Sequence, residues 1–283
     1  MTYLFRKAFG RRVTLAFFLL GGALPGLAQD AVKEQLTVAL SAPGKPGSLE
    51  VSLVNGSIHV SGYGGKDVVI DAATHAQSSK KSEPTLPANA AGLKRIPAGN
   101  TLNLTAEERN NRVEISTESW KNPIDLTIKV PRAFSLKLST VNHGDIVVEN
   151  VSGELEITNV NGRIALNQVA GSAVANTVNG NLTATFTSIT ASAPMAFSTL
   201  NGKVDVTLPG NANVALKMKS DRGNVYSDFD VALSKGQPKV TRTSQNGLTH
   251  LSTDDWTYGK INSGGAEVMM KTFNGDIFLR KAK

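Results

Sequence analysis

A nine-residue pattern of apolar and polar positions repeats five times between residues 143 and 187. Glycine takes the second place of every unit, and an aliphatic residue or alanine takes the fourth and sixth places. Valine takes the ninth place of the first four units. The units read HGDIVVENV, SGELEITNV, NGRIALNQV, AGSAVANTV and NGNLTATFT. Because residues two apart share one face of a strand, this alternation predicts short β-strands with one apolar face.

Two units together give a longer period of eighteen residues. Asn-Gly or a variant of it recurs at this spacing, and related pairs lie at 55–56, 201–202, 222–223 and 274–275. The pattern predicts an all-β fold, a β-solenoid or β-helix-like stack with coils of about 18–22 residues, each with two strands and two glycine corners. A hairpin closed by Asn-Gly is the alternative. The solenoid is favoured because the units recur without reversing their pattern and each leaves an apolar face that needs a neighbour. We also expect the corner asparagines to form amide ladders between coils.

Segments outside the repeat alternate less regularly, yet they still predict strands. These strands are expected at 35–40, 48–53, 57–60, 67–71, 101–105, 112–117 and 124–130. Loop insertions are expected near 77–100, which is rich in Ser, Lys and Pro, and near 227–265, which is rich in Gly, Ser and Asp but contains strand-like segments such as 239–243. We expect residues 29–283 to form a single domain.

Residues 1–28 show the three parts of an export signal. Basic residues lie before residue 13, a mostly apolar run extends to residue 24, and Gly26-Leu27-Ala28 supplies a small-residue cleavage site. The run of about a dozen residues is too short to span a bilayer, and an uncleaved anchor is the rival interpretation. No second run of spanning length follows, so no transmembrane segment is expected after cleavage. We expect an exported, periplasmic protein, with the cell surface and the extracellular medium as alternatives. Arg11-Arg12 does not distinguish Sec from twin-arginine export.

Charge and cysteine content narrow the function classes. The formal net charge is +7, but residues 29–283 carry 26 basic and 23 acidic groups, which leaves +3. A domain so near neutrality is a poor electrostatic binder of nucleic acid. Cysteine is absent, which excludes disulfide scaffolds, cysteine nucleophiles, thiolate metal sites and a lipid-anchoring cysteine.

Several segments resemble the bacterial putative-adhesin family, a domain of unknown function built from Gly-punctuated β repeats. They are VNGSIHV at 54–60, VPR at 130–132 leading into LKLSTVNHGDI at 136–146, LPG at 208–210 ahead of VAL at 214–216, and KTFNGDI at 271–277. The resemblance covers roughly residues 34–281 and implies an exported all-β solenoid-like domain without a known reaction. The chain departs from the family pattern at His143 and Arg222, where Asn is typical, and in the Ala-rich unit 170–178.

Candidate catalytic and ligand-binding groups are sparse. The four histidines, His59, His75, His143 and His250, have no partner at metal-site spacing. Ser78 and Lys81 have a Ser-x-x-Lys spacing without its companion motifs, and the Gly-rich segment 62–65 precedes a strand instead of a phosphate-binding helix. The tight acid pairs are Asp228 with Asp230 and Asp254 with Asp255, with Tyr226 and Trp256 as conceivable sugar-stacking neighbours. We expect no catalytic, cofactor-binding or metal-binding residue, and no cofactor.

Three functional hypotheses remain. The first is a non-catalytic envelope protein that binds an unidentified envelope protein or glycan through a broad outward face, and not nucleic acid. The others are a carbohydrate-active β-helix enzyme and an element that assembles end to end; the oligomeric state stays open. The repeat register predicts two outward columns of side chains on this face. They are Asp145, Arg163, Asn181 and Lys203, and Val147, Ala165, Thr183 and Asp205.

The export signal generates the first prediction. Cleavage after Ala28 gives a mature chain that starts at Gln29, because the small residues at Gly26 and Ala28 fit signal peptidase. The intact mass of the exported protein measures this directly. A membrane fraction that retains residues 1–28 would contradict the prediction.

Overall fold

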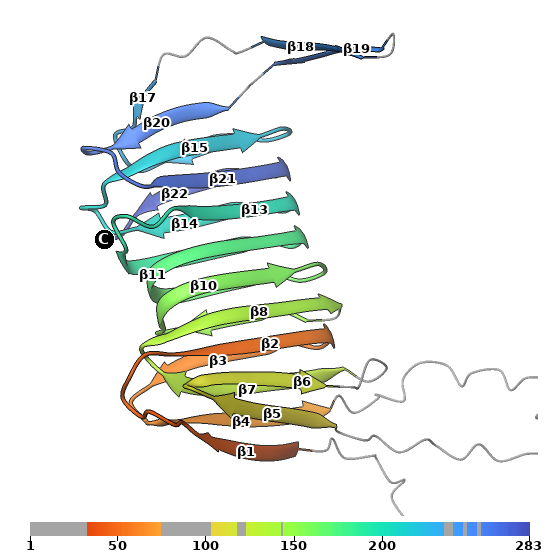
Figure 1. The fold of residues 1–283 in the computed structure, drawn as a ribbon. Coiled ribbons are helices and arrows are strands. Elements are labelled where there is room, and N and C mark those ends of the chain that lie inside the picture. The colour runs from red at the N-terminus through yellow and green to blue at the C-terminus, as the bar shows by residue number, and fades with distance from the viewer. Residues whose placement is uncertain are drawn as a thin grey trace, which may run out of the picture. The chain divides into compact units, whose positions relative to one another are not determined.

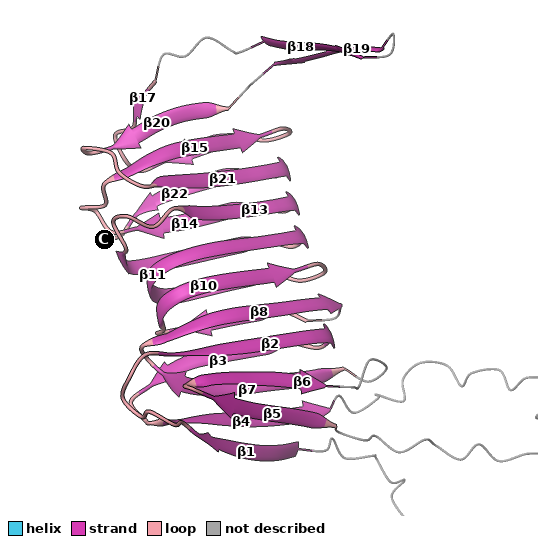
Figure 2. Cartoon of the chain, viewed as in Figure 1, coloured by secondary structure: helices cyan, strands magenta, loops and turns pink. Residues whose placement is uncertain are grey.

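Every element of regular structure in the described residues is a β-strand (Figure 2). The computed structural model describes residues 33–74, 103–117, 123–142, 144–234, 240–245, 248–253 and 256–283. The residues at the fourth and sixth places of the five repeat units are all buried, at 0–3% exposure. The predicted alternation is therefore confirmed, and these side chains form the core of a β-solenoid. Within the described part of the chain, no helix is long and apolar enough to cross a membrane.

The strands form two layers that enclose the core between them (Figure 1). The first layer runs in the order β5 (Leu104–Arg109), β6 (Arg112–Thr117), β2 (Gly47–Asn55), β8 (Phe134–Asn142), β10 (Ser152–Asn159), the second half of β11 (Ile164–Asn179), β13 (Met195–Asn201), β21 (Glu267–Asn274), β15 (Val214–Ser220), β20 (Thr257–Ile261) and β17 (Ala232–Leu233). From β6 to β15 neighbouring strands are parallel, as coils wound in one direction require.

The second layer follows the same stacking order. It contains β1 (Lys33–Ala39), β4 (Asp67–Thr74), β7 (Ile124–Pro131), β3 (Ile58–Tyr63), β9 (Ile146–Glu149), the first half of β11, β12 (Leu182–Ile189), β14 (Val204–Leu208), β22 (Ile277–Lys281) and β16 (Val225–Ser227). Strands β18 (Val240–Gln245) and β19 (Leu248–Thr253) form a separate antiparallel hairpin. The predicted insertion 227–265 thus contains this hairpin together with β17 and β20, and β20 pairs directly with β15.

The coils do not stack in the order of the chain. Strands β2 and β3, from the beginning of the described chain, lie between the coil of β6–β7 and the coil of β8–β9. Strands β21 and β22, from its end, lie between the coil of β13–β14 and the coil of β15–β16. Both terminal coils are therefore internal layers of the solenoid.

One corner of each coil is a column of closely packed glycines. A Cβ atom on Gly162 would lie 2.0 Å from the carbonyl oxygen of Gly144, and one on Gly180 would lie 2.1 Å from the carbonyl oxygen of Gly162. Gly162 has no positive φ, so the requirement for glycine there comes from the close approach of the next coil. The other corner instead uses a left-handed backbone at Asn150 and Gln168, with φ of 56° and 52°.

Buried polar side chains satisfy the carbonyl groups at the glycine corner. Thr177 Oγ1 donates to the Gly162 carbonyl at 2.9 Å, and Thr272 Oγ1 donates to the Gly202 carbonyl at 2.8 Å. Equivalent bonds come from Thr140, Thr199 and Ser220 and from Asn159 Nδ2. A buried carbonyl without a partner costs roughly 1–3 kcal/mol, so this column of hydroxyls stabilises each corner.

The predicted amide ladder is confirmed at the outside of the same corner. Each asparagine donates through Nδ2 to Oδ1 of the asparagine in the adjacent coil, over 2.7–3.0 Å. The ladder contains Asn142, Asn161, Asn179, Asn201 and Asn274. It extends across the intercalated terminal coil, because Asn201 contacts Asn274 and not the corner residue Arg222 of the next coil in sequence.

One predicted detail differs in the structure. The glycine pattern predicts a corner between two strands at Gly171, but the chain passes from one layer to the other at Gln168, where φ is 52° and the register of β11 shifts between Leu166 and Ala170. Gly171 follows within the same strand, with φ of 110°. Of the ninth-place valines, Val151 and Val169 are buried, whereas Val160 and Val178 are partly exposed. Residues 1–28 and the predicted loop 77–100 lie outside the described residues.

An ion-pair cluster fastens the intercalated β22 to β14. Arg280 Nε and Nη2 contact the two carboxylate oxygens of Asp205 at 2.7 and 3.2 Å, and Lys203 Nζ lies 3.2 Å from Asp205 Oδ2. Burial raises the pKa of Asp205, but hydrogen bonds and charge from Arg280 and Lys203 outweigh it and hold this pKa below its usual value.

The glycine corner generates a stability prediction. Gly162→Ala should lower the free energy of unfolding by about 2–3 kcal/mol, because the new methyl group collides with the backbone of the adjacent coil. Gly64→Ala is the matched control, since nothing lies within 4 Å of a Cβ there, and it should change stability by less than about 0.5 kcal/mol. Denaturant melts of both variants measure the difference. Equal small losses would show that the corner does not need glycine.

The Asp205 cluster generates a pH prediction. The pKa of Asp205 is lower in the folded protein than in the unfolded chain. The ionised carboxylate therefore contributes fully to the free energy of unfolding above the unfolded-state pKa near 4, and this contribution is lost as the pH falls through the folded-state pKa. Asp205→Asn should therefore cost about 1 kcal/mol at pH 7 and progressively less toward pH 3. Melts of both proteins between pH 7 and pH 3 measure this convergence. A cost that stays constant over that range would contradict the assignment.

Candidate functional site

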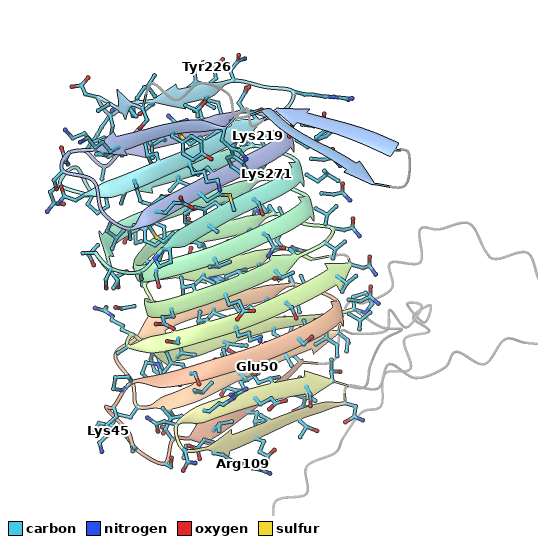
Figure 3. The ribbon with its side chains drawn as sticks, turned by 45° about the horizontal axis from the view of Figure 1, so that its top comes forward. Lys45, Glu50, Arg109, Lys219, Tyr226 and Lys271 are labelled. Atoms are coloured by element: carbon cyan, nitrogen blue, oxygen red, sulfur yellow. The ribbon has the colours of Figure 1, made fainter. Side chains whose placement is uncertain are left out.

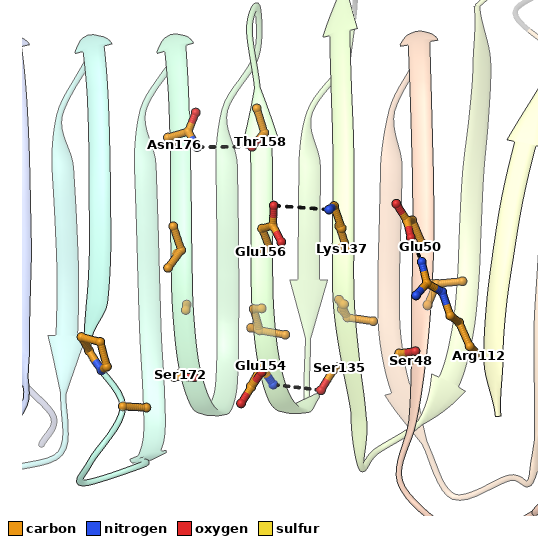
Figure 4. Close-up of a pocket in the computed structure, with 17 residues that line it drawn as sticks. Ser48, Glu50, Arg112, Ser135, Lys137, Glu154, Glu156, Thr158, Ser172 and Asn176 are labelled. Carbon is orange, nitrogen blue, oxygen red and sulfur yellow. Dashed lines mark hydrogen bonds and ion pairs between the residues drawn. The ribbon is translucent and has the colours of Figure 1, made fainter. Parts of the chain in front are cut away.

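A groove of about 650 Å³ crosses the outer surface of the first layer, from β6 to the segment before β13 (Figure 4). We call this surface the groove face. Its lining comes from outward positions of consecutive strands in the stack, because every second residue of each strand points away from the core. The polar lining residues are Ser48, Glu50, Arg112, Ser135, Lys137, Glu154, Glu156, Thr158, Ser172 and Asn176.

Charged groups in the groove are largely paired across strands. Arg112 forms an ion pair with Glu50, and Lys137 Nζ lies 3.7 Å from Glu156 Oε1. Asn176 Nδ2 donates to Thr158 Oγ1 at 3.2 Å. All of these side chains are at least partly exposed, so a partner that enters the groove meets alternating acids, bases and hydroxyls instead of one desolvated reactive group.

A second hollow of about 420 Å³ adjoins the first and shares Val174 and Asn176 with it. It continues across β13 and β21 as far as Asp221 after β15, and Ala196, Leu200 and Met269 line it together with Lys271 and Phe273. The two hollows therefore form a furrow that runs across the strands. Such a furrow suits an elongated partner that makes many modest contacts.

A row of partly exposed apolar side chains borders the groove face beside the asparagine ladder. Val54, Val141 and Leu200 are 48%, 40% and 47% exposed, and Phe273 is 37% exposed. Val160 and Val178 complete the row between them. Each strand thus contributes one apolar residue at the same level, and their side chains form a stripe rather than scattered single exposures.

The two predicted outward columns form in the expected register, but on the opposite layer. Arg163 N donates to Asp145 Oδ1 at 2.9 Å, and Lys203 N donates to Asn181 Oδ1 at 3.0 Å. Val147, Ala165, Thr183 and Asp205 also align across β9, β11, β12 and β14. Neither hollow touches these columns. The residues of the groove face are not among the site residues predicted from the sequence.

The acid pair considered for glycosidase chemistry is not built into a cleft. Asp228 and Asp230 are both exposed, and neither lines the groove or the second hollow. The aromatic neighbours considered with them lie on different layers. Tyr226 stacks on Phe278 of β22 at 5.2 Å between centroids, whereas Trp256 lies beside Lys217 of β15.

The remaining candidates form no metal or catalytic cluster. Among the described residues, no three His, Cys, Asp or Glu side chains come together as metal ligands would. His59 is on β3, where its Nε2 lies 3.4 Å from Glu149 Oε2. A hydrogen bond from Asn167 lowers the pKa of Glu149. The side chains of His75, His143 and His250, and the residues Ser78, Lys81, Asp254 and Asp255, fall outside the described part.

The chain is similar to two solved structures and matches a protein family. One structure is a putative cell adhesion protein from Clostridium sporogenes ATCC 15579, with 12% sequence identity and a TM-score of 0.36. The alignment covers 89% of this chain and 100% of that protein's chain. A putative adhesin from Bacteroides fragilis NCTC 9343 shares 11% identity with a TM-score of 0.37, with coverages of 90% and 98%. No curated protein matches the sequence. The family described as Toastrack DUF4097 matches residues 47–280, nearly all of the solenoid, and confirms the resemblance that the repeat motifs indicated. The chain is therefore a member of the Toastrack DUF4097 family.

Proposed function

We propose that this protein is an exported, non-catalytic binding protein whose groove face holds an elongated envelope partner, either a protein or a glycan. The observation that carries the proposal is the furrow formed by the two adjoining hollows. Its polar and charged lining lies on a broad face of parallel strands, which hold the side chains rigidly without enclosing them. Rigid placement of many modest contacts favours binding along a length instead of reaction at a point.

The same features support a non-catalytic role. Acid–base catalysis generally needs a titratable group whose pKa is shifted by burial and which faces a bound substrate. The groove carboxylates Glu50 and Glu156 are instead paired with bases and partly exposed. Asp228 and Asp230 are exposed outside the furrow. The enzyme hypothesis therefore lacks a converging set of groups among the described residues.

End-to-end assembly receives less support from the outer coils. Strand β1 carries exposed polar residues such as Lys33 and Glu34, and it pairs antiparallel with β4. Near β16 and β17, the side chains of Phe229 and Val231 pack against the core. Leu36 of β1, Tyr226 of β16 and Leu233 of β17 are exposed as single apolar side chains, and a flat apolar end of the kind that would favour polymerisation is not formed by these strands.

Export to the periplasm, with residues 1–28 removed as a signal peptide, completes the proposal. It is supported by the basic, apolar and small-residue order of the N-terminal sequence. A single domain from residue 29 to the end is supported by the continuity of the strand ladder from β1 to β22.

Column variants test the groove face. Glu50, Lys137, Glu156 and Val174 share one outward column, so changing all four to Ala should weaken retention of envelope components by the immobilised mature protein at least tenfold. Each single change should weaken it by less than about threefold, because contacts along a furrow are distributed. Quantitative mass spectrometry of the retained material measures both effects.

The matched control lies on the opposite layer. Val147→Ala with Thr183→Ala alters a column that touches neither hollow and should leave retention unchanged. Circular dichroism melts verify that all variants fold. Loss of retention in the control, or none in the groove variant, would refute the proposal. Turnover of envelope glycan that disappears with Asp228→Asn would favour the enzyme hypothesis instead.

A further inference from the structure

Basic and aromatic side chains gather at one end of the groove face. Figure 3 shows Lys219 and Lys271 there, with Glu50 farther along the same face. We define the basic–aromatic end as Lys217, Lys219, Arg222, Trp256, Lys271 and Phe273. Lys219 of β15 lies beside Lys271 of β21 in the strand register, and Lys217 lies beside Met269. The cluster therefore borders the second hollow, of which Lys271 and Phe273 are lining residues.

Aromatic rings contact three of the four cations of this cluster. Lys217 Nζ lies 4.8 Å and Lys271 Nζ 6.0 Å from the centroid of the Trp256 ring, and Arg222 Cζ lies 4.9 Å from that of Phe273. Cation–π contacts of this kind orient the charge without neutralising it. The acid in the hollow is Asp221, which contacts Lys219 at 3.3 Å. Glu267 also lies on the outward face of β21, so among the described side chains of this end four basic groups face two carboxylates.

At the other end of the groove face, acidic side chains slightly outnumber basic ones. There Glu50 and Glu156 are paired with Arg112 and Lys137, and Glu154 adds a further carboxylate to the lining. Charge along the furrow thus changes from balanced or slightly negative to positive. A ligand attracted to the basic–aromatic end by charge must be anionic.

The arrangement of the cations favours a polymer over a single small anion. They project from neighbouring strands about 4.7–4.9 Å apart, instead of converging on one point as around a phosphate. The hollow beside them has an apolar floor, with Ala196 and Leu200 of β13 and Met269 of β21. Sugar rings have apolar faces that pack on such a floor and on aromatic rings, and uronic acids carry one carboxylate per ring, so charge and apolar contact alternate along the chain.

The site disfavours the two other common polyanions. Acidic peptides typically dock as an added strand on a sheet edge, where main-chain groups are unpaired. Here β15 and β21 are hydrogen-bonded to neighbours on both sides, so the cluster offers side chains only. Nucleic acid needs a dense positive field, and residues 29–283 carry a net charge of only +3.

We propose that the basic–aromatic end binds a carboxylate-bearing polysaccharide of the uronic-acid type, laid along the furrow across the strands. This proposal rests on the proposed function, because it assigns a ligand class to one end of the same groove face. Carboxylates contact the lysines and Arg222, and the apolar faces of the sugar rings contact Trp256, Phe273 and the floor of the hollow.

Titration of the mature protein with polygalacturonate tests the proposal. Isothermal calorimetry should show binding that weakens at least tenfold when NaCl rises from 50 to 300 mM. The Lys217→Gln, Lys271→Gln double variant should bind at least tenfold more weakly than wild type, and Trp256→Leu at least threefold. The matched control is Lys129→Gln, an exposed lysine on β7 of the opposite layer, which should bind as wild type does.

Parallel titrations identify the class of ligand. Neutral dextran of similar length should not bind, and poly-glutamate and a single-stranded oligonucleotide should bind at least tenfold more weakly than polygalacturonate. Equal or tighter binding of either polyanion, equal affinity of the double variant and wild type, or no binding of polygalacturonate overturns the assignment. If polygalacturonate fails while the Glu50 column variants still lose envelope components, the proposed function stands without this ligand. If those variants lose nothing, the proposed function fails as well.

Discussion

The close approach of consecutive coils at the glycine corner is the constraint on which the solenoid depends. Each corner brings a glycine against the backbone of the adjacent coil, where even a methyl group would overlap a carbonyl oxygen. The same approach buries that carbonyl, so a threonine, serine or asparagine must supply a hydrogen bond from inside the coil. The asparagine outside the corner then meets its counterpart and extends the ladder. Glycine, hydroxyl and amide are therefore required together, which explains why Thr, an apolar residue, Asn and Gly recur in this order at 177–180, 199–202 and 272–275.

The coil itself could be predicted from sequence because its determinants are local. Alternation at Ile146 and Val148, or at Ile164 and Leu166, specifies both the strand and its buried face, and both pairs are buried. Stacking order could not be predicted in the same way. Every coil presents a similar apolar interior and a similar corner, so the pattern does not specify which coil lies next to which. Arg222 in place of Asn, noted only as a departure from the family pattern, marks the coil to which the amide ladder does not extend.

The position of the groove face could not be predicted from sequence for the same reason, because it depends on the stacking order of the coils. Sequence reasoning aligned residues of successive units and obtained correct columns on the opposite layer. The groove, in contrast, is lined in part by β6, β2 and β8, and β2 lies between β6 and β8 only because an early coil is intercalated. Its ion pair between Arg112 and Glu50 joins residues 62 positions apart. The basic–aromatic end likewise combines β21 with β15 and Trp256, which are distant in the chain, and the repeat pattern does not specify that they become neighbours.

Intercalation of both terminal coils has a consequence for how the molecule is made. A solenoid wound in chain order can grow layer by layer as its chain emerges, but here the coil of β15 and β16 has no parallel neighbour until residues 267–281 are present. The late contacts span large sequence separations, which slows folding. Completion of the stack therefore requires residues 267–281, and a chain cut before β21 lacks an inner layer rather than an end. Loss of the C-terminal segment would expose the apolar interior of two coils at once, a state readily recognised by proteases.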